Sequence, residues 1–512
     1  MPPIKTPSVP QLRRDAKRLR RAWDMGEPAA RRRVEAVQAP DRRTELKHAD
    51  FLHIVARENG FESWPRLTWA AETVGLPRAA RQRQLGQALA HGINWRVTAL
   101  LQETPDLAHD LFGQSCAVYD RARVAVMLDE DPGRATRQCG RWRPIAHLAF
   151  SRYIHARPEL VADMLAIAEM LLANGADVND AITAEAAPGS PLSVLYGAIG
   201  HADNMALGRW LLEHGANPND GEALYHATEL GHHEGLRLLL SHGATPAGTN
   251  ALLRALDFHD HGAVALLLEH GASADEFVPA GDGEEPAWVV PALHQAARRG
   301  CDRRMADLLL DAGADPLRPY QGASAWAYAR VFGNRDVAEA IAGRTGTAAL
   351  TEEEALLARA ADGQDSPGRY IDPARLPEAY RDIIRTILHL PGRLDHLRRL
   401  VALGVEYDRP DAMGVTPVQV AGWEGLPEVM AYLLSLRPDL THVNRYGGTL
   451  LSTILHGSTN CPAAAVRDHA ACLELALTHG VALPRAAVEF AGREDLAAFL
   501  QDWAEAHPGQ VV

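Results

Sequence analysis

One short phrase, LLxxGA, recurs along this chain of 512 residues and limits what it can fold into. The phrase stands at 171–176, 211–216, 239–244, 267–272 and 309–314. Its glycines are therefore spaced by 40, 28, 28 and 42 residues. Self-similarity at intervals of about 20 to 50 residues is typical of stacked repeats. The chain is also too long for one ordinary hydrophobic core, which favours an extended array.

Each phrase predicts the end of a helix. Its leucines lie on one helical face, and the glycine can take the positive φ that stops a helix at little steric cost. A second short helical pattern precedes the phrase, as in EALYHATELG, where Leu224, Ala227 and Leu230 share one face. We therefore expect an all-α chain built from helix–turn–helix units. One such unit cannot bury its apolar face alone, so the units must stack.

The units resemble ankyrin repeats. PALHQAARRGCDRRMADLLLDAGADP (291–316) and GVTPVQVAGWEGLPEVMAYLL (414–434) carry the resemblance, which is strong over 160–345 and good over 395–512. It is weaker over 86–159. The phrases ARENGFESWPRL and YGGTLLSTILHGSTNC are also similar to bacterial ankyrin proteins that begin with a basic helical region. The resemblance implies an ankyrin-type helical solenoid with an N-terminal helical cap.

We expect four segments. A basic helical region covers 1–85, a first repeat block covers 86–345 and is degenerate at 86–159, a connecting segment covers 346–375, and a second block covers 376–512. The intervals of 40 and 42 residues require inserted loops, of which 273–291 is the clearest.

Charge is divided unevenly along the chain. Residues 1–85 hold 18 Lys and Arg against 10 Asp and Glu, a net charge of +8, whereas the remainder of the chain carries −21. Within the basic region, Leu12, Ala16, Leu19 and Trp23 share one face of a helix expected over 10–24. This region therefore contacts either nucleic acid or an acidic surface, including one on the chain itself.

Histidines are the candidate metal ligands. His232 and His233 are adjacent, so on a helix they point about 100° apart and cannot easily share a metal. His259 and His261 are two residues apart, which suits a chelate only in an extended loop. By the ankyrin resemblance, His294 bonds backbone between repeats. We interpret all five as structural and expect no metal.

No catalytic motif stands out. G-x-S-x-G, G-x-x-x-x-G-K-S/T and H-E-x-x-H are all absent. The five cysteines are scattered, odd in number and without a CxxC pair, which favours a reducing compartment. There is no secretory signal pattern and no uncharged run that could span a bilayer. We therefore expect a cytoplasmic, non-enzymatic protein without a cofactor.

The favoured function is a protein–protein interaction scaffold whose partner, an unidentified protein, binds the concave face of the array. In ankyrin repeats, the residues just before the glycine that ends each first helix project toward the partner. Carried over by motif, the candidate partner-binding residues are Glu229, Leu230, Phe258, His259, Arg298, Arg299, Val331, Phe332, Trp423 and Glu424.

The alternative function is a nucleic-acid-associated regulator. Its basic N-terminal region would contact phosphate while the repeats recruit another protein. The residues proposed for phosphate contact are Arg13, Arg14, Lys17, Arg18, Arg20 and Arg21. Nucleic acid is not the favoured partner, because no aromatic interleaving or nucleic-acid motif accompanies the charge.

Overall fold

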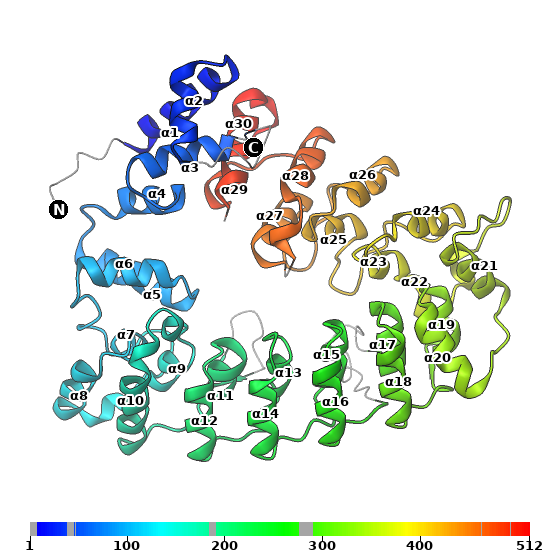
Figure 1. Cartoon of the computed structure of the whole chain (residues 1–512), viewed down its shortest axis with the longest axis horizontal. Helices are drawn as coiled ribbons and strands as arrows, with labels where there is room; N and C mark the ends of the chain where they lie inside the picture. Colours follow the sequence, from blue (N-terminus) through cyan, green and yellow to red (C-terminus); the bar gives the residue numbers. More distant parts are fainter. Residues whose placement is uncertain are drawn as a thin grey trace. The chain divides into compact units, whose positions relative to one another are not determined.

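The regular secondary structure, in a computed structural model, is almost entirely helical (Figure 1). The structure describes residues 8–37, 46, 48–183, 191–275, 290–461, 463–491 and 493–512. Its strands form two short antiparallel pairs, β1 (Ala181–Thr183) with β2 (Pro191–Ser193), and β3 (Pro319–Tyr320) with β4 (Ala323–Ser324). Ile182 pairs with Leu192, and Tyr320 with Ala323. The predicted all-α repeat fold is confirmed.

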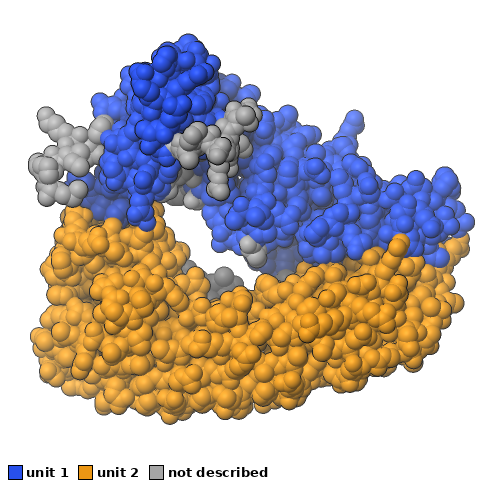
Figure 2. Space-filling model, in the orientation of Figure 1, with its two compact units in different colours: residues 1–76, 355–512 blue, residues 77–354 orange. Residues whose placement is uncertain are grey.

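The chain divides into two compact units, which Figure 2 colours separately. Unit 2 is the continuous stretch Pro77–Glu354, and unit 1 combines Met1–Leu76 with Ala355–Val512. The four predicted segments stay a prediction, although one helix, Arg78–Ala90, runs across the expected boundary at 85. Most of the inserted loop expected at 273–291 lies outside the described residues.

Unit 2 is a stack of helix pairs. Each first helix contacts the first helix of the next pair, and most second helices contact second helices, so two layers form (Figure 1). The first helices are α5 (Arg78–Ala90), α7 (Phe112–Ala117), α9 (Pro144–Ala149), α11 (Val194–Tyr196), α13 (Ala223–Ala227), α15 (Ala251–Asp257), α17 (Ala292–Arg299) and α19 (Ala325–Val331). The second helices are α6 (Asn94–Glu103), α8 (Arg121–Glu130), α10 (Val161–Ala173), α12 (Met205–Glu213), α14 (Glu234–Ser241), α16 (His261–Glu269), α18 (Arg303–Asp311) and α20 (Arg335–Thr345).

The LLxxGA phrase is the cap that ends a second helix. Gly243, for example, has a φ of +89°. The amide of the following alanine then donates to the carbonyl of the first leucine of the phrase, as from Ala244 to Leu239 at 3.1 Å. The other four copies repeat both features. This bond satisfies a carbonyl that the end of the helix would leave without a partner, so the predicted glycine stop is confirmed.

The same phrase supplies the core. Its first leucine is fully buried in every copy, because it lies between the two helix layers. Burying a leucine contributes about 1.5 to 3 kcal/mol. The five residues concerned are Leu171, Leu211, Leu239, Leu267 and Leu309.

Unit 1 begins with four helices that share a small core. Leu12, Ala16 and Leu19 are buried in it as predicted, and Trp23 packs edge-on against Phe51 with ring centroids 6.5 Å apart. The four helices are α1 (Val9–Asp24), α2 (Pro28–Glu35), α3 (His48–Glu58) and α4 (Trp64–Thr73).

The second segment of unit 1 is again a run of helices. Its successive pairs include α25 with α26, and α27 with α28. The helices are α21 (Glu352–Ala361), α22 (Glu378–Arg381), α23 (Ile383–Ile387), α24 (Leu394–Ala402), α25 (Pro417–Trp423), α26 (Pro427–Ser435), α27 (Leu450–Asn460), α28 (His469–Thr478), α29 (Arg485–Phe490) and α30 (Glu494–Ala506). Short 3-10 or π turns connect several helices in both units. Across the described ranges, none of the helices has the length and apolar character needed to cross a membrane.

Candidate interaction site

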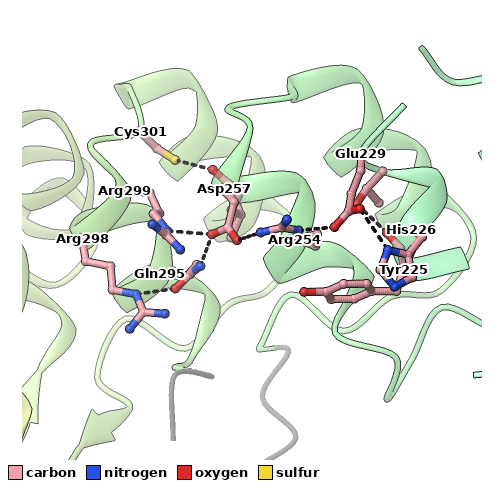
Figure 3. A network of polar contacts seen from close by, with 11 residues as sticks. Tyr225, His226, Glu229, Arg254, Asp257, Gln295, Arg298, Arg299 and Cys301 are labelled. Atoms are coloured by element: carbon pink, nitrogen blue, oxygen red, sulfur yellow. Dashed lines mark hydrogen bonds and ion pairs between the residues drawn. The ribbon is translucent and has the colours of Figure 1, made fainter. Parts of the chain in front are cut away.

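A network of polar contacts joins the ends of three consecutive first helices of unit 2 (Figure 3). Asp257, the last residue of α15, lies at its centre with its side chain 13% exposed. Its carboxylate accepts hydrogen bonds from Arg254 at 2.9 Å, from Arg299 at 2.7 Å and from Gln295. Because Gln295 and Arg299 belong to α17, the carboxylate holds two neighbouring repeats together.

The network continues into the preceding repeat. Arg254 Nε donates to Glu229 Oε1 at 2.8 Å, and Glu229 Oε2 lies 2.9 Å from His226 Nδ1. Burial lowers the pKa of His226, but its hydrogen bonds to Glu222 and Glu229 outweigh burial and raise the pKa to about 9. His226 is therefore an imidazolium at neutral pH. Positive and negative groups alternate from His226 to Arg299.

Phe258 stands at the edge of this network. It follows the last residue of α15, and the residue is 43% exposed. The Arg254 guanidinium lies 4.8 Å from the centroid of the Phe258 ring, within cation–π range. The next residue, His259, has a φ of +55° and contacts the carbonyl of Arg299 at 2.7 Å. The turn after α15 is thus fixed against the following repeat.

Six predicted partner-binding residues lie at these helix ends. The structure brings Glu229, Arg298 and Arg299 into the polar network, where Arg298 Nε donates to Gln295 Oε1 at 2.6 Å. Phe258 and His259 are exposed, and Leu230 is half-buried.

The prediction that Val331 and Phe332 bind a partner is wrong, because the structure buries both residues. They are 0% and 1% exposed, and Phe332 stacks on Tyr328 with ring centroids 4.2 Å apart. Their position relative to Gly333 matches the motif, but both side chains are apolar and pack into the core. They offer no surface to a partner, because both belong to the core between repeats.

Trp423 and Glu424 lie at the corresponding end of α25, in unit 1. The Trp423 carbonyl contacts His469 Nε2 at 2.9 Å. Glu424, with its side chain 18% exposed, lies 3.6 Å from Cys461 Sγ and 4.0 Å from Arg467 Nη2. Both residues therefore also contact the following pair of helices.

The side chains of the histidines considered as metal ligands point to different neighbours. His232 Nε2 lies 3.0 Å from Asp203, on the side of the preceding repeat, whereas His233 Nε2 lies 2.9 Å from Asp260, on the side of the following one. His261 Nε2 contacts Asp302 at 2.8 Å. Within the described ranges, no group of three or more histidine, cysteine or carboxylate side chains could hold a metal ion.

His294 behaves as the resemblance implies. Its side chain is fully buried, and its Nε2 contacts the Ala323 carbonyl of the next repeat at 3.3 Å. Burial lowers the pKa of His294 to about 4, so the ring is neutral. Its structural role between repeats is confirmed.

Sequence reasoning missed the residues that organise the site. Arg254, Asp257, Gln295 and His226 occupy no motif position, and the partners of Asp257 on α17 stand 38 and 42 residues further along the chain. The one local signal is the spacing of Arg254 and Asp257, three residues apart on a helix.

The cations proposed for phosphate contact lie on α1. Lys17 Nζ is 3.0 Å from Glu505 and 3.4 Å from Asp502, and Arg13 donates to Gln501 at 2.7 Å. Arg18 and Arg20 approach Asp15 and Asp24 of their own helix. Arg14 and Arg21 are exposed, and no ion pair joins them to a described residue.

Stacked helix pairs with glycine-capped second helices define a helical repeat protein. Residues 195–278 match the family model of ankyrin repeats in three copies. This stretch therefore consists of ankyrin repeats, and ankyrin repeats indicate a protein–protein interaction module.

Solved structures with similarity to the chain include two ankyrin repeat domains. The human ASB11 domain is 22% identical with a TM-score of 0.34, and the match covers 46% of this chain and 99% of that one. A domain from Acinetobacter baumannii AYE is 21% identical with a TM-score of 0.30, covering 39% of this chain and 95% of that one. No curated protein matches the sequence.

Proposed function

We propose that this chain is a non-enzymatic scaffold that binds a partner protein on the helix-end surface of unit 2. This surface is defined by the residues at and just after the ends of α13, α15 and α17. Its members are Glu229, Leu230, Phe258, His259, Arg298 and Arg299. The proposal rests on one observation, that the Asp257 carboxylate fixes arginines from two successive repeats.

Preorganised side chains are the physical reason to place the binding site on this surface. Ordering a long side chain at an interface costs about 0.5 to 1.5 kcal/mol, and that cost is smaller when the side chain is already held. Arg254 and Arg299 are each bonded to Asp257, and Arg254 also lies against Phe258. Arginine and aromatic residues are frequent binding hot spots. A partner would therefore meet side chains that are already held in place, with the exposed Phe258 ring beside the fixed Arg254.

Site-specific photocrosslinking tests the proposal. A photoreactive phenylalanine analogue placed at 258 in the full-length chain is expected to capture one partner protein in cells. The matched position is Val126, an exposed apolar residue on second helix α8. Capture at 258 and none at 126 supports the helix-end surface. Equal capture at both positions, or none at 258, contradicts it.

Trp423 and Glu424 form a second proposed contact position, in unit 1. Its support is their placement before Gly425, at the end of α25. The proposed compartment is the cytoplasm, for which the free state of all five cysteines is the support.

Nucleic-acid binding by α1 is the second candidate function, and the contacts of α1 make it the weaker one. Lys17 and Arg13 engage α30, and Arg18 and Arg20 have acidic neighbours on their own helix. The support that remains is the exposure of Arg14 and Arg21. A gel shift with a DNA duplex at low salt tests it: a shift that weakens with salt supports phosphate contact. An unshifted duplex removes the candidate.

A further inference from the structure

The two ends of the chain meet within unit 1. Lys17 and Glu505 are 488 residues apart in sequence, yet Lys17 Nζ lies 3.0 Å from Glu505 Oε2. Arg13 Nη1 and Gln501 Oε1, equally far apart in sequence, are 2.7 Å apart. Both pairs join α1 to α30, and their common spacing of four residues places them one turn apart on each helix.

Apolar packing accompanies these polar pairs. Ala498 of α30 packs against the core that α1, α3 and α4 share, and α3 contacts α30 directly. Ala498 and Gln501 are three residues apart, so they lie on neighbouring positions of one face of α30. The contact therefore has an apolar centre with a charged border.

In a repeat array, each repeat contacts its neighbours along the chain. At the C-terminal end of this array, α30 packs on α28 and α29 from the array side. Helices from the other end of the sequence supply a further contact. The sequence agrees, since the basic N-terminal region carries +8 and the rest of the chain −21.

We propose that the acidic face of α30 is a binding surface for the chain's own basic N-terminal helices, which form a reversible clasp that opens before the repeats unfold. The clasp is weak in its polar part, because the side chains of Lys17, Asp502 and Glu505 are 38%, 39% and 58% exposed. Exposed pairs of this kind contribute little and are screened by salt. While closed, the clasp withholds Lys17 and Arg13 from other anionic partners.

Hydrogen exchange on the full-length chain, read by mass spectrometry, tests the clasp. Lys17→Glu places a carboxylate beside Asp502 and Glu505, so amides of α3 and α30 are expected to exchange about five-fold faster. Amides of α13, α15 and α17 should not change. Arg14→Glu is the matched control, since it makes the same charge change on an exposed residue of α1 without an ion pair to a described residue.

A chain in which the charges of the contact are swapped distinguishes loss of the clasp from general damage to α1. In a chain that combines Lys17→Glu with Asp502→Lys and Glu505→Lys, exchange in α30 is expected to return toward the original rate. Equal acceleration of α30 in the Lys17→Glu and Arg14→Glu chains overturns the proposal, and so does failure of the charge-exchanged chain to recover.

A zero-length carbodiimide cross-link provides a readout that needs no variant. It joins an amine to a carboxylate in direct contact, so Lys17 should link to Glu505 or Asp502 within single chains at high dilution. The yield should fall as salt is raised. Absence of the link, or its presence only between two copies of the chain, overturns the clasp.

Discussion

Arg299 Nε lies 2.7 Å from Asp257 Oδ1, although the two residues belong to successive repeats and stand 42 positions apart. In an array, each repeat is stabilised mainly by its nearest neighbours. A carboxylate that accepts from Arg254 in its own helix and from Gln295 and Arg299 in the next one adds to that neighbour contact. The same bonds fix side chains of the helix-end surface, so stability and binding depend on one residue.

Asp257→Ala tests the stabilising role of the network. The substitution leaves two partly buried guanidinium groups without their shared acceptor, which is expected to lower the free energy of unfolding by about 2 to 3 kcal/mol. Urea denaturation measures the change. Asp311→Ala is the control, because the Asp311 side chain is 67% exposed at its ion pair with Arg344. It should change stability by no more than about 0.5 kcal/mol, and equal losses would refute the central role of Asp257.

The raised pKa of His226 predicts that the protein loses stability in mild alkali. Its pKa of about 9 in the fold exceeds the value of about 6.5 for an unfolded histidine. Protonation therefore stabilises the fold fully below about pH 6.5, and the contribution, on the order of 2 kcal/mol, is lost as pH rises through 9. Denaturation of the original chain and of His226→Gln should give curves that converge by pH 9. A constant difference across that range would rule out the charged imidazole.

The lowered pKa of His294 predicts that the protein loses stability in mild acid. Its pKa of about 4 lies below the unfolded value of about 6.5, so acid protonates the unfolded chain first. Stability is full above about pH 6.5 and falls by on the order of 2 to 3 kcal/mol as pH drops toward 4. His294→Gln should be less stable at pH 7 but less dependent on pH over this window, as followed by thermal melts. An unchanged pH slope would contradict the assignment.

Gly457→Ala should damage the fold more than an alanine at a helix stop. A Cβ at 457 would lie 2.1 Å from the backbone carbonyl oxygen of Trp423, which cannot rotate away, so we expect a loss of about 3 kcal/mol or more. Gly480→Ala is the control in the same unit. There a Cβ meets nothing within 4 Å and only the φ of +87° is unfavourable, a loss of about 1 to 2 kcal/mol. Denaturation midpoints that rank the two variants in the opposite order would contradict this packing.

The sequence predicts local structure well here because the repeat signal is local. The leucines and glycine of LLxxGA specify a helix, its buried face and its cap within six residues. His294 follows from the family pattern in the same way. The face of α1 is likewise readable, because Leu12, Ala16 and Leu19 are spaced for one helical stripe.

The rest depends on how distant segments stack. Phe258 and Phe332 occupy similar places before the next helix, yet Phe258 is 43% exposed and Phe332 only 1%. Phe332 stacks on Tyr328, four positions earlier, whereas the neighbour at that distance from Phe258 is Arg254. The repeat motif does not specify the residue at that position. For the contact of Lys17 with Glu505, the sequence provides only the uneven distribution of charge along the chain. That distribution predicts the sign of the charge on the two surfaces but not which residues meet.

Binding affinity tests the central claim most directly, once photocrosslinking at 258 has identified the partner. The measurement is the Kd of that partner for the full-length chain, for Phe258→Ala and for Val126→Ala. If the helix-end surface binds the partner, Phe258→Ala weakens the affinity by about thirty-fold, as loss of a hot spot of about 2 kcal/mol requires, and Val126→Ala leaves it unchanged. An unchanged Kd for Phe258→Ala, in a chain that is folded by circular dichroism, would contradict the account.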